Sequence, residues 1–256
     1  MRSDVDIVIR TCNSGETLAE CLSSAKEKLH YNKIIVIDHF SEDNTVDIAR
    51  KFGCEIYFEG LGLGFATSFG IRCSSAKYLL FLDSDVIVKR ENFVEDSIAI
   101  LNDHRVGAVV GMSAGHPFSY GLPLGLTTFR REILEKIYIP GFVGSRETYF
   151  IQSFLRERHL KIVYLEKAMI HNSLHRRNRY WPEWQGSWVR ITAGLNPREV
   201  LYSMLVVFLM LLNSRKMRNI LYIPIFQAKL LRGFINPDKW SHSLDRITKK
   251  GRVDTS

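Results

Sequence analysis

The chain has 256 residues, of which 46% are hydrophobic and 24% are charged. These values are ordinary for a globular protein, and they exclude wholesale disorder, a collagen-like chain and a bundle of many membrane spans. The net charge of +8 is unevenly distributed: residues 1–155 hold 16 Lys and Arg against 20 Asp and Glu, whereas residues 156–256 hold 19 against 7. The basic second part predicts an anionic partner, such as a lipid surface, a phosphorylated substrate or nucleic acid.

The first 111 residues alternate between short apolar runs and segments with helical spacing. The expected strands are 5–10, 33–38, 54–58, 78–82 and 106–111, and the expected helices are 16–29, 43–52, 66–75 and 91–102. Alternation at this spacing predicts βαβ units, and therefore an α/β fold with a mainly parallel sheet flanked by helices.

The regular alternation stops after Gly111. We expect a loop over 115–125, helices over 127–137 and 147–157, a strand over 161–165 and a basic aromatic segment over 171–188. Two apolar runs, 200–212 and 220–235, then flank a basic break at 215–218. We therefore expect one domain over residues 1–195 and a basic, apolar helical extension over 196–256.

The cysteines and the N-terminus indicate a reducing compartment. Cys12, Cys21, Cys54 and Cys73 form no C-x-x-C pair, which favours reduced thiols over a disulfide framework or a zinc site. The first residues also lack a basic and then apolar signal region. We therefore expect the chemistry to face the cytoplasm.

Two acidic residues follow the most apolar predicted strand. Ligands of open parallel sheets bind at the carboxyl ends of the strands, and Asp83 and Asp85 lie just past residues 78–82. Carboxylates one residue apart can bind Mg²⁺ or Mn²⁺, with the remaining ligands coming from substrate phosphates. The alternative is a solvated turn in which an Asp caps the next helix.

Other strand ends also deliver polar residues to this edge. Arg10, Thr11 and Asn13 lie at the end of the first strand, and Asp38 ends the second. Asp38 can accept hydrogen bonds from a nucleobase or ribose, or it can act as a turn residue before the next helix.

These segments together resemble the family 2 glycosyltransferases, which are inverting enzymes with a GT-A fold. The resemblance covers roughly Val5 to Trp188. The matching motifs are Val8-Ile9-Arg10-Thr11-Cys12-Asn13 for V-I-P-T-Y-N, the segment from Val36 to Thr45 for V-V-D-D-G-S-x-D-x-T, and Tyr78-Leu79-Leu80-Phe81-Leu82-Asp83-Ser84-Asp85 for Y-L-L-F-L-D-A-D.

The resemblance implies roles for individual residues. A nucleoside-diphosphate sugar, UDP- or GDP-linked, would be bound by Arg10, Thr11, Asn13, Asp38, Asp83 and Ser84. An Mn²⁺ or Mg²⁺ ion that bridges the donor diphosphate would be held by Asp83, Asp85 and His171. The family's acceptor-side E-D pair aligns with Glu147-Thr148, so Glu147 is the candidate general base.

Three departures from the family pattern bear on the donor. His39 stands where many members have a second Asp that reads uracil, and Arg10 replaces Pro. Thr67 stands where an Arg is common, which would leave the diphosphate with one cation fewer.

The favoured function is metal-dependent, inverting transfer of a sugar from a nucleoside-diphosphate sugar to a lipid-linked acceptor or a polysaccharide. A lipid-linked acceptor would be a polyprenyl phosphate or its oligosaccharide. A nucleotidyltransferase of sugar metabolism is an alternative, because it shares the sheet and a metal-binding acid. A nucleic-acid-binding protein is another, suggested by Tyr180, Trp181, Trp184 and Trp188 among basic residues.

The apolar runs beside these aromatic residues favour a membrane over nucleic acid, and we expect no nucleic-acid partner. Residues 200–212 are shorter than the roughly 20 residues of a spanning helix. We therefore expect 196–256 to lie on the cytoplasmic surface of the membrane, as a peripheral or monotopic attachment.

Overall fold

The computed structural model describes residues 4–113, 122–172, 181–213 and 217–237. The chain divides into two compact units: Met1–Val143 with Phe150–Leu174, and Gly144–Tyr149 with His175–Ser256. The second unit begins earlier in the chain than the division expected after residue 195. The assignment of catalysis and membrane association to separate domains stays a prediction.

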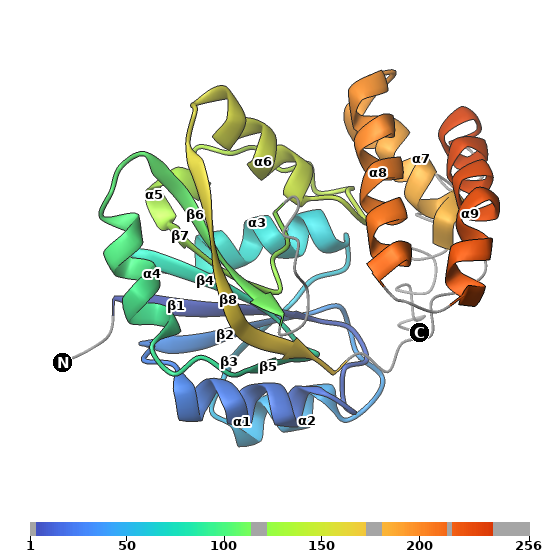
Figure 1. The fold of residues 1–256 in the computed structure, drawn as a ribbon. Helices are drawn as coiled ribbons and strands as arrows, with labels where there is room; N and C mark the ends of the chain where they lie inside the picture. Colours follow the sequence, from blue (N-terminus) through green and yellow to red (C-terminus); the bar gives the residue numbers. More distant parts are fainter. Residues whose placement is uncertain (1–3, 114–121, 173–180, 214–216, 238–256) are drawn as a thin grey trace. The chain divides into compact units, whose positions relative to one another are not determined.

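A mixed sheet forms the centre of the first unit (Figure 1). Its strands are β1 (Val5–Thr11), β2 (Lys33–Asp38), β3 (Glu55–Phe58), β4 (Tyr78–Asp83), β5 (Val86–Val88), β6 (Val106–Ser113), β7 (Leu126–Arg130) and β8 (Lys161–His171). They lie in the order β3-β2-β1-β4-β7-β6-β8-β5. Strand β1 is parallel to β2 and β4, and β2 is parallel to β3, which confirms the predicted mainly parallel sheet.

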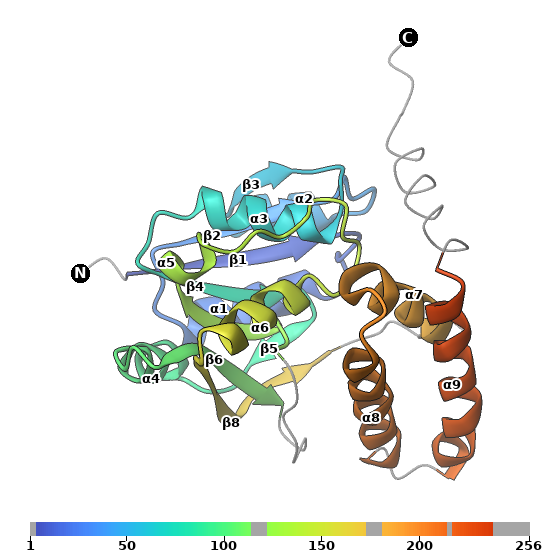
Figure 2. The ribbon, with the colours of Figure 1, turned by 90° about the horizontal axis from the view of Figure 1, so that it is seen from above.

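Helices cover both faces of this sheet (Figure 2). One face carries α1 (Leu18–Lys28), α2 (Thr45–Lys51) and α4 (Phe93–Leu101), and the other carries α3 (Leu63–Cys73), α5 (Arg131–Leu134) and α6 (Thr148–Glu157). Alternate residues of a strand point to opposite faces, so Leu80 packs with the first group of helices and Phe81 with the second. Both faces of the strand are therefore apolar, as its continuous hydrophobic sequence indicates.

The helix expected over 127–137 is wrong in its first part. Residues Leu126–Arg130 form β7, which is antiparallel to both β4 and β6, and only Arg131–Leu134 are helical. Apolar residues at 126, 129, 133 and 134 imitate helical spacing. Pairing with a strand on each side overrides that local pattern, because it satisfies the backbone of β7 along both edges.

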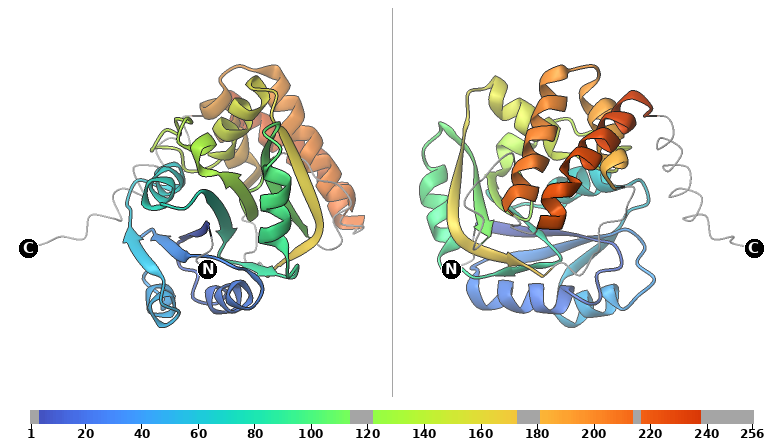
Figure 3. Two further views of the ribbon diagram at one scale, coloured as in Figure 1. Left: turned by 90° about the vertical axis from the view of Figure 1, so that its left-hand side faces the viewer. Right: turned by 45° about the vertical axis from the view of Figure 1, so that its right-hand side comes forward.

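Three helices make up the described core of the second unit: α7 (Trp181–Ala193), α8 (Pro197–Asn213) and α9 (Met217–Ile235) (Figure 3). Two glycines allow α7 and α9 to approach closely. A Cβ at Gly186 would lie 1.9 Å from the carbonyl oxygen of Leu230, and one at Gly233 would lie 1.8 Å from that of Glu183. The helical expectation for the two apolar runs is confirmed. None of the helices in the described ranges is both long and apolar enough to cross a membrane.

A buried carboxylate joins three segments at the amino end of the sheet. Asp6 of β1 is 0% exposed, and it accepts hydrogen bonds from Asn32 Nδ2 at 2.9 Å and Ser74 Oγ at 2.8 Å. The backbone N–H groups of Ser75 and Ala76 also donate to it, at 2.9 and 3.1 Å. Burial by itself would raise the pKa of Asp6, but these hydrogen bonds outweigh burial and lower it.

We expect Asp6→Asn to lower the free energy of unfolding at pH 7 by about 1–3 kcal/mol, because an amide cannot accept all four hydrogen bonds. The lowered pKa means that the ionised Asp6 stabilises the fold above about pH 4, and that this stabilisation is lost as the pH falls. The difference in the free energy of unfolding between wild type and Asp6→Asn should therefore become smaller at acidic pH. Urea unfolding at pH 7 and below pH 4 measures it, with the exposed Asp4→Asn as control. A difference independent of pH would contradict this account.

Candidate active site

The carboxyl ends of β1, β2 and β4 meet at one edge of the sheet. The strand register places Thr11 opposite Asp38 and Arg10 opposite Asp83. The polar residues predicted at three separate strand ends are therefore neighbours, as the parallel sheet requires. Because the chain leaves each of these strands at the same edge, the loops that follow also begin there.

Asp38 forms the most buried contact of this edge. Its side chain is 0% exposed, and its Oδ2 accepts hydrogen bonds from Thr11 Oγ1 at 2.7 Å and Ser41 Oγ at 2.6 Å. Its Oδ1 accepts one from the backbone N–H of Ser41 at 2.7 Å. Asp38 therefore binds the end of β1 to the loop after β2, which is the turn role left open from the sequence. Direct contact of Thr11 or Asp38 with a nucleotide stays a prediction.

Asn13 and Ser84 also connect loops at this edge. The exposed Asn13 adopts a φ of 49°, a left-handed conformation that Asn tolerates better than most residues. Its Oδ1 accepts a hydrogen bond from the backbone N–H of Glu42 at 2.9 Å, and Ser84 Oγ donates to Ser14 Oγ at 2.9 Å. Both predicted donor-binding residues thus lie beside the ends of the strands.

Arg10 brings a positive charge next to Thr67, the position where the family commonly has an Arg. Its Nη1 donates a hydrogen bond to Thr67 Oγ1 at 3.1 Å, and its Nη2 forms an ion pair with Asp83 Oδ1 at 2.9 Å. The Arg10 side chain is only 9% exposed. The Arg10 guanidinium on β1 thus contacts the Thr67 hydroxyl on α3. The two residues that depart from the family pattern are therefore neighbours.

Asp85 and His171 come together from distant parts of the sequence. His171 ends β8 and pairs with Val86 of β5, which places its Nδ1 3.6 Å from Asp85 Oδ1. The Asp85 carboxylate raises the pKa of His171, first as a hydrogen-bonding partner of the imidazolium and then through its negative charge, to which Asp83 adds. The sequence suggested this proximity only through motif order, and the antiparallel pairing of β5 and β8 produces it.

Gly125 leaves space between Asp83 and His171. A Cβ at this position would lie 3.3 Å from Asp83 Oδ2 and 3.4 Å from His171 Cε1. The Asp83 carboxylate and the His171 imidazole lie beside this space, and Asp85 lies next to His171; these ligand types suit Mn²⁺ or Mg²⁺ in their chemistry. Across the ranges that the structure describes, no three acidic, His or Cys side chains form a ready-made metal cluster. The binding of an ion by Asp83, Asp85 and His171, with further ligands from substrate oxygen atoms, stays a prediction.

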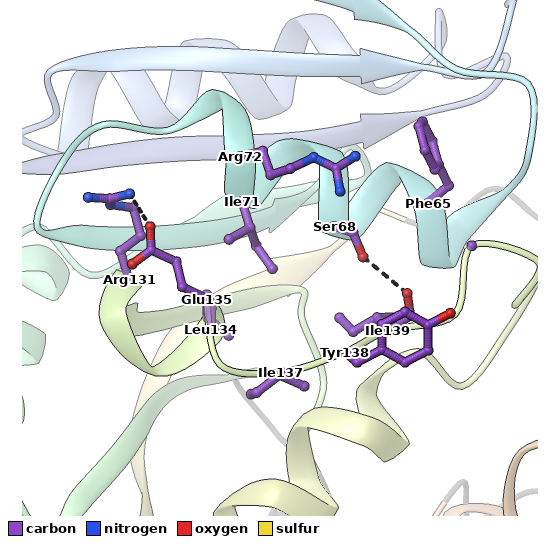
Figure 4. A pocket seen from close by; sticks show the side chains of 11 residues that line it. Phe65, Ser68, Ile71, Arg72, Arg131, Leu134, Glu135, Ile137, Tyr138 and Ile139 are labelled. Carbon is purple, nitrogen blue, oxygen red and sulfur yellow. Dashed lines mark hydrogen bonds and ion pairs between the residues drawn. The ribbon is translucent and has the colours of Figure 1, made fainter.

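Two cavities of the first unit lie away from the candidate site. One has a volume of about 510 Å³ and lies between α3, α5 and residues 137–141 (Figure 4). Ser68 Oγ donates to the Ile139 carbonyl at 3.3 Å within it, and Arg131 pairs with Glu135 beside it. No residue of the predicted site lines this cavity. The candidate site described here is an edge of the sheet with polar loops.

Glu147 belongs to the second unit. It immediately precedes α6 and is 5% exposed. The neighbouring Arg146, which has a φ of 62°, donates to Ser203 Oγ at 2.8 Å and pairs with Glu199 at 3.0 Å. The segment around Glu147 is therefore firmly attached to α8. Its service as a general base stays a prediction.

The aromatic residues that suggested nucleic-acid binding pack within the second unit. Trp188 is 2% exposed, and Trp181 contacts Phe226 edge to face with ring centroids 5.5 Å apart. Tyr180 and the arginines at 176, 177 and 179 lie outside the described residues. The buried indole of Trp188 cannot stack on a base, whereas Trp181 and Trp184 are half-buried.

The mixed, mainly parallel sheet with polar residues at its carboxyl edge is an α/β fold of the GT-A type. Solved structures support this class. Glucosyl-3-phosphoglycerate synthase from Mycobacterium tuberculosis, in complex with Mn²⁺, UDP-glucose and phosphoglyceric acid, matches with a TM-score of 0.59 and 20% identity, covering 76% of this chain and 79% of that one. The complex of that synthase with Mg²⁺ and UDP matches with a TM-score of 0.57 and 20% identity, covering 76% and 78%.

Sequence comparison identifies the family. The profile of glycosyl transferase family 2 matches residues 6–154, more than half of the chain, and the protein belongs to this family. A glycosyltransferase of Rickettsia typhi is 33% identical over 102 residues, which cover 38% of this chain and 32% of that protein. The poly(ribitol-phosphate) β-N-acetylglucosaminyltransferase TarP of Staphylococcus aureus is 27% identical over 118 residues, covering 42% and 36%. The matches span about a third of the length of these relatives.

Proposed function

We propose that the protein transfers a sugar, with inversion, from a nucleoside-diphosphate sugar to a lipid-linked acceptor or a polysaccharide, and that it uses Mn²⁺ or Mg²⁺. The position of Asp83 and His171 beside Gly125, with Asp85 next to His171, carries this proposal. It lies at the edge of the sheet where ligands of this architecture bind. Family membership favours glycosyl transfer over the nucleotidyltransferase alternative.

The donor diphosphate would lie beside the acidic residues and Arg10. An ion held by Asp83, Asp85 and His171 would neutralise the negative charge that develops on the departing diphosphate. Arg10 orients Asp83 through their 2.9 Å ion pair, and its guanidinium adds positive charge at the same position. The structures of the same fold that hold UDP together with Mn²⁺ or Mg²⁺ make a UDP-sugar the first donor to test.

The acceptor oxygen would form a bond to the anomeric carbon while the bond from that carbon to the diphosphate breaks. A hydroxyl acceptor loses a proton in this step, and Glu147 would receive it. An acceptor phosphate is already anionic and would need no base. The effect of replacing Glu147 on the rate of sugar transfer therefore distinguishes a hydroxyl acceptor from a phosphate acceptor.

The test of the function is a screen of nucleotide sugars with Mn²⁺ or Mg²⁺, in which release of free nucleoside diphosphate is measured. We expect turnover with at least one donor and its loss in excess chelator. Asp85→Ala should lower turnover about a hundredfold or more, because an anionic ligand is lost next to the departing charge. Asp47→Ala, an exposed acid on α2, is the control. Full activity of Asp85→Ala, or of the wild type in chelator, would contradict the metal-dependent mechanism.

Glu147→Gln should lower kcat far more than it weakens donor binding, because the amide keeps the shape but cannot accept a proton. The variant is compared with wild type in steady-state kinetics, and donor affinity is measured separately by calorimetry. Glu157→Gln, at the exposed end of α6, serves as the control. An unchanged kcat would assign the acceptor to the anionic class or the base to another residue.

The second unit offers a surface for a membrane on the cytoplasmic side, where a polyprenyl-phosphate acceptor would lie. Exposed apolar side chains recur at helical spacing: Leu201, Leu205 and Phe208 on α8, and Leu221, Ile225 and Ile235 on α9, with exposed fractions from 40% to 71%. The opposite side of α9 buries Phe226 and Leu230. Apolar faces on short helices, in the basic part of the chain, suit attachment to an anionic interface.

We expect the full chain to sediment with anionic vesicles and Leu221→Gln/Ile225→Gln to do so several-fold less, because two apolar contacts with the acyl boundary are lost. Tyr138→Gln, which removes an 81% exposed ring from the first unit, should bind as the wild type does. Equal binding of wild type and the α9 variant, or no binding by either, would contradict membrane attachment through this face.

A further inference from the structure

The cavity between α3, α5 and residues 137–141 has the size and the composition of a ligand site (Figure 4). Its volume of about 510 Å³ lies in the range of pockets that bind small organic molecules. Such pockets are mostly apolar, with a few polar groups that orient the ligand. The apolar lining here consists of Phe65, Ile71, Leu134, Ile137 and Ile139, and the polar lining includes Ser68 and Arg72.

Hydrogen bonds hold the two walls of this cavity together. The backbone N–H of Gly64 on α3 donates to the carbonyl of Val143 at 2.7 Å. Ser68 Oγ, also on α3, donates to the carbonyl of Ile139 at 3.3 Å. A Cβ at Gly64 would lie 2.4 Å from the carbonyl oxygen of Pro140, so the absence of a side chain allows this close approach. Because the walls are already joined, binding of a ligand would require little ordering of the protein.

Arg72 brings a positive charge to the cavity. Its guanidinium lies over the rings of Phe65 and Phe69, 5.6 and 5.7 Å from their centroids. In the part of the chain that the structure describes, no carboxylate forms an ion pair with Arg72. A guanidinium that stacks on aromatic rings keeps the N–H groups at its edge for hydrogen bonding. Arg72 can therefore bind a carboxylate or a phosphate through two parallel hydrogen bonds.

The other charged residues that line the cavity neutralise each other. Arg131 forms an ion pair with Glu135, and its Nε donates to the carbonyl of Ala76 at 2.9 Å. The net charge of the lining is therefore that of Arg72. A ligand with one anionic group and an apolar body matches this distribution. Its anionic group can reach Arg72 while its body displaces water from the apolar side chains.

We propose that this cavity is a second ligand site, which binds a small amphipathic anion: an apolar body that carries one carboxylate or phosphate group. The anionic group pairs with Arg72, and the apolar body lies between Ile71 of α3 and Ile137 of the opposite wall (Figure 4). No residue of the candidate active site lines the cavity. The inference therefore goes beyond the proposed sugar transfer and does not depend on it.

Fluorescence titration of the full chain with two dyes tests the role of the charge. Anilinonaphthalene sulfonate has an apolar body and one negative charge, and phenylnaphthylamine has the same body without the charge. Arg72→Gln should weaken binding of the anionic dye about fivefold, as for an ion pair that water partly screens, and leave the neutral dye nearly unchanged. Arg50→Gln, which replaces an exposed arginine on α2, is the matched control and should bind both dyes as the wild type does.

A second variant tests the place of binding. A Cβ at Gly141 would lie 3.5 Å from Phe65 Cδ2, which is an ordinary contact distance, so a larger side chain can enter the cavity there. Gly141→Leu should weaken both dyes several-fold, because its side chain takes the space of the apolar body. The same titrations with Leu221→Gln/Ile225→Gln identify any dye that binds to the exposed apolar face of α9 instead.

Competition distinguishes the two anionic groups. Naphthoate and naphthyl phosphate share an apolar body and differ in the anion that they carry. Displacement of the anionic dye by one of them supports the site and identifies its preferred group. Displacement by neither would overturn the proposal.

Thermal unfolding establishes that each variant is folded, and Arg72→Gln decides the question if Gly141→Leu is not. Unchanged binding of the anionic dye by folded Arg72→Gln, or an equal loss of both dyes, would overturn the proposal. Self-association of the chain that Tyr138→Gln abolishes would assign this face to a second copy and would also overturn it. Release of nucleoside diphosphate measures sugar transfer separately, so the proposed function stands or fails independently of these results.

Discussion

The buried carboxylate of Asp38 holds the ends of β1 and β2 together, and the arrangement of the candidate site depends on it. Its three hydrogen bonds reach Thr11 and both the backbone and the side chain of Ser41. A buried charge of this kind is stable only when its hydrogen-bonding capacity is satisfied, so the two loops cannot separate without a large cost. Asp38 thereby joins the two chain segments that carry Arg10 and His39.

The distribution of charge along this edge separates two environments. Beside β4, the carboxylates of Asp83 and Asp85 are accompanied by Arg10 and by His171, so positive and negative groups alternate. Beside β2 and β3, Asp38 and Glu59 dominate, and they act on the thiol of Cys12. An anionic group with a cation is favoured at the first place and a hydrogen-bond donor at the second.

The second unit is built on a different physical principle from the sheet. Because Gly186 and Gly233 have no side chains, α7 and α9 pack backbone to backbone. This packing buries one side of α9 and leaves apolar residues on the other. Hydrophobic pattern alone could not distinguish the buried face from the exposed one, because both are apolar.

The sequence by itself determined the alternation of strands and helices, the parallel pairing of the first strands and the family, because these depend on local apolar periodicity and on motifs of adjacent residues. It placed Arg10, Asp38, Asp83 and Asp85 at strand ends for the same reason. Only the tertiary structure decided that Leu126–Arg130 is a strand, since its partners β4 and β6 lie far away in the chain. It also decided that Arg10 contacts Thr67 and that Glu59 holds His39, over 57 and 20 residues of sequence. Such contacts arise where distant segments of the chain pack side by side, and no local sequence pattern encodes them.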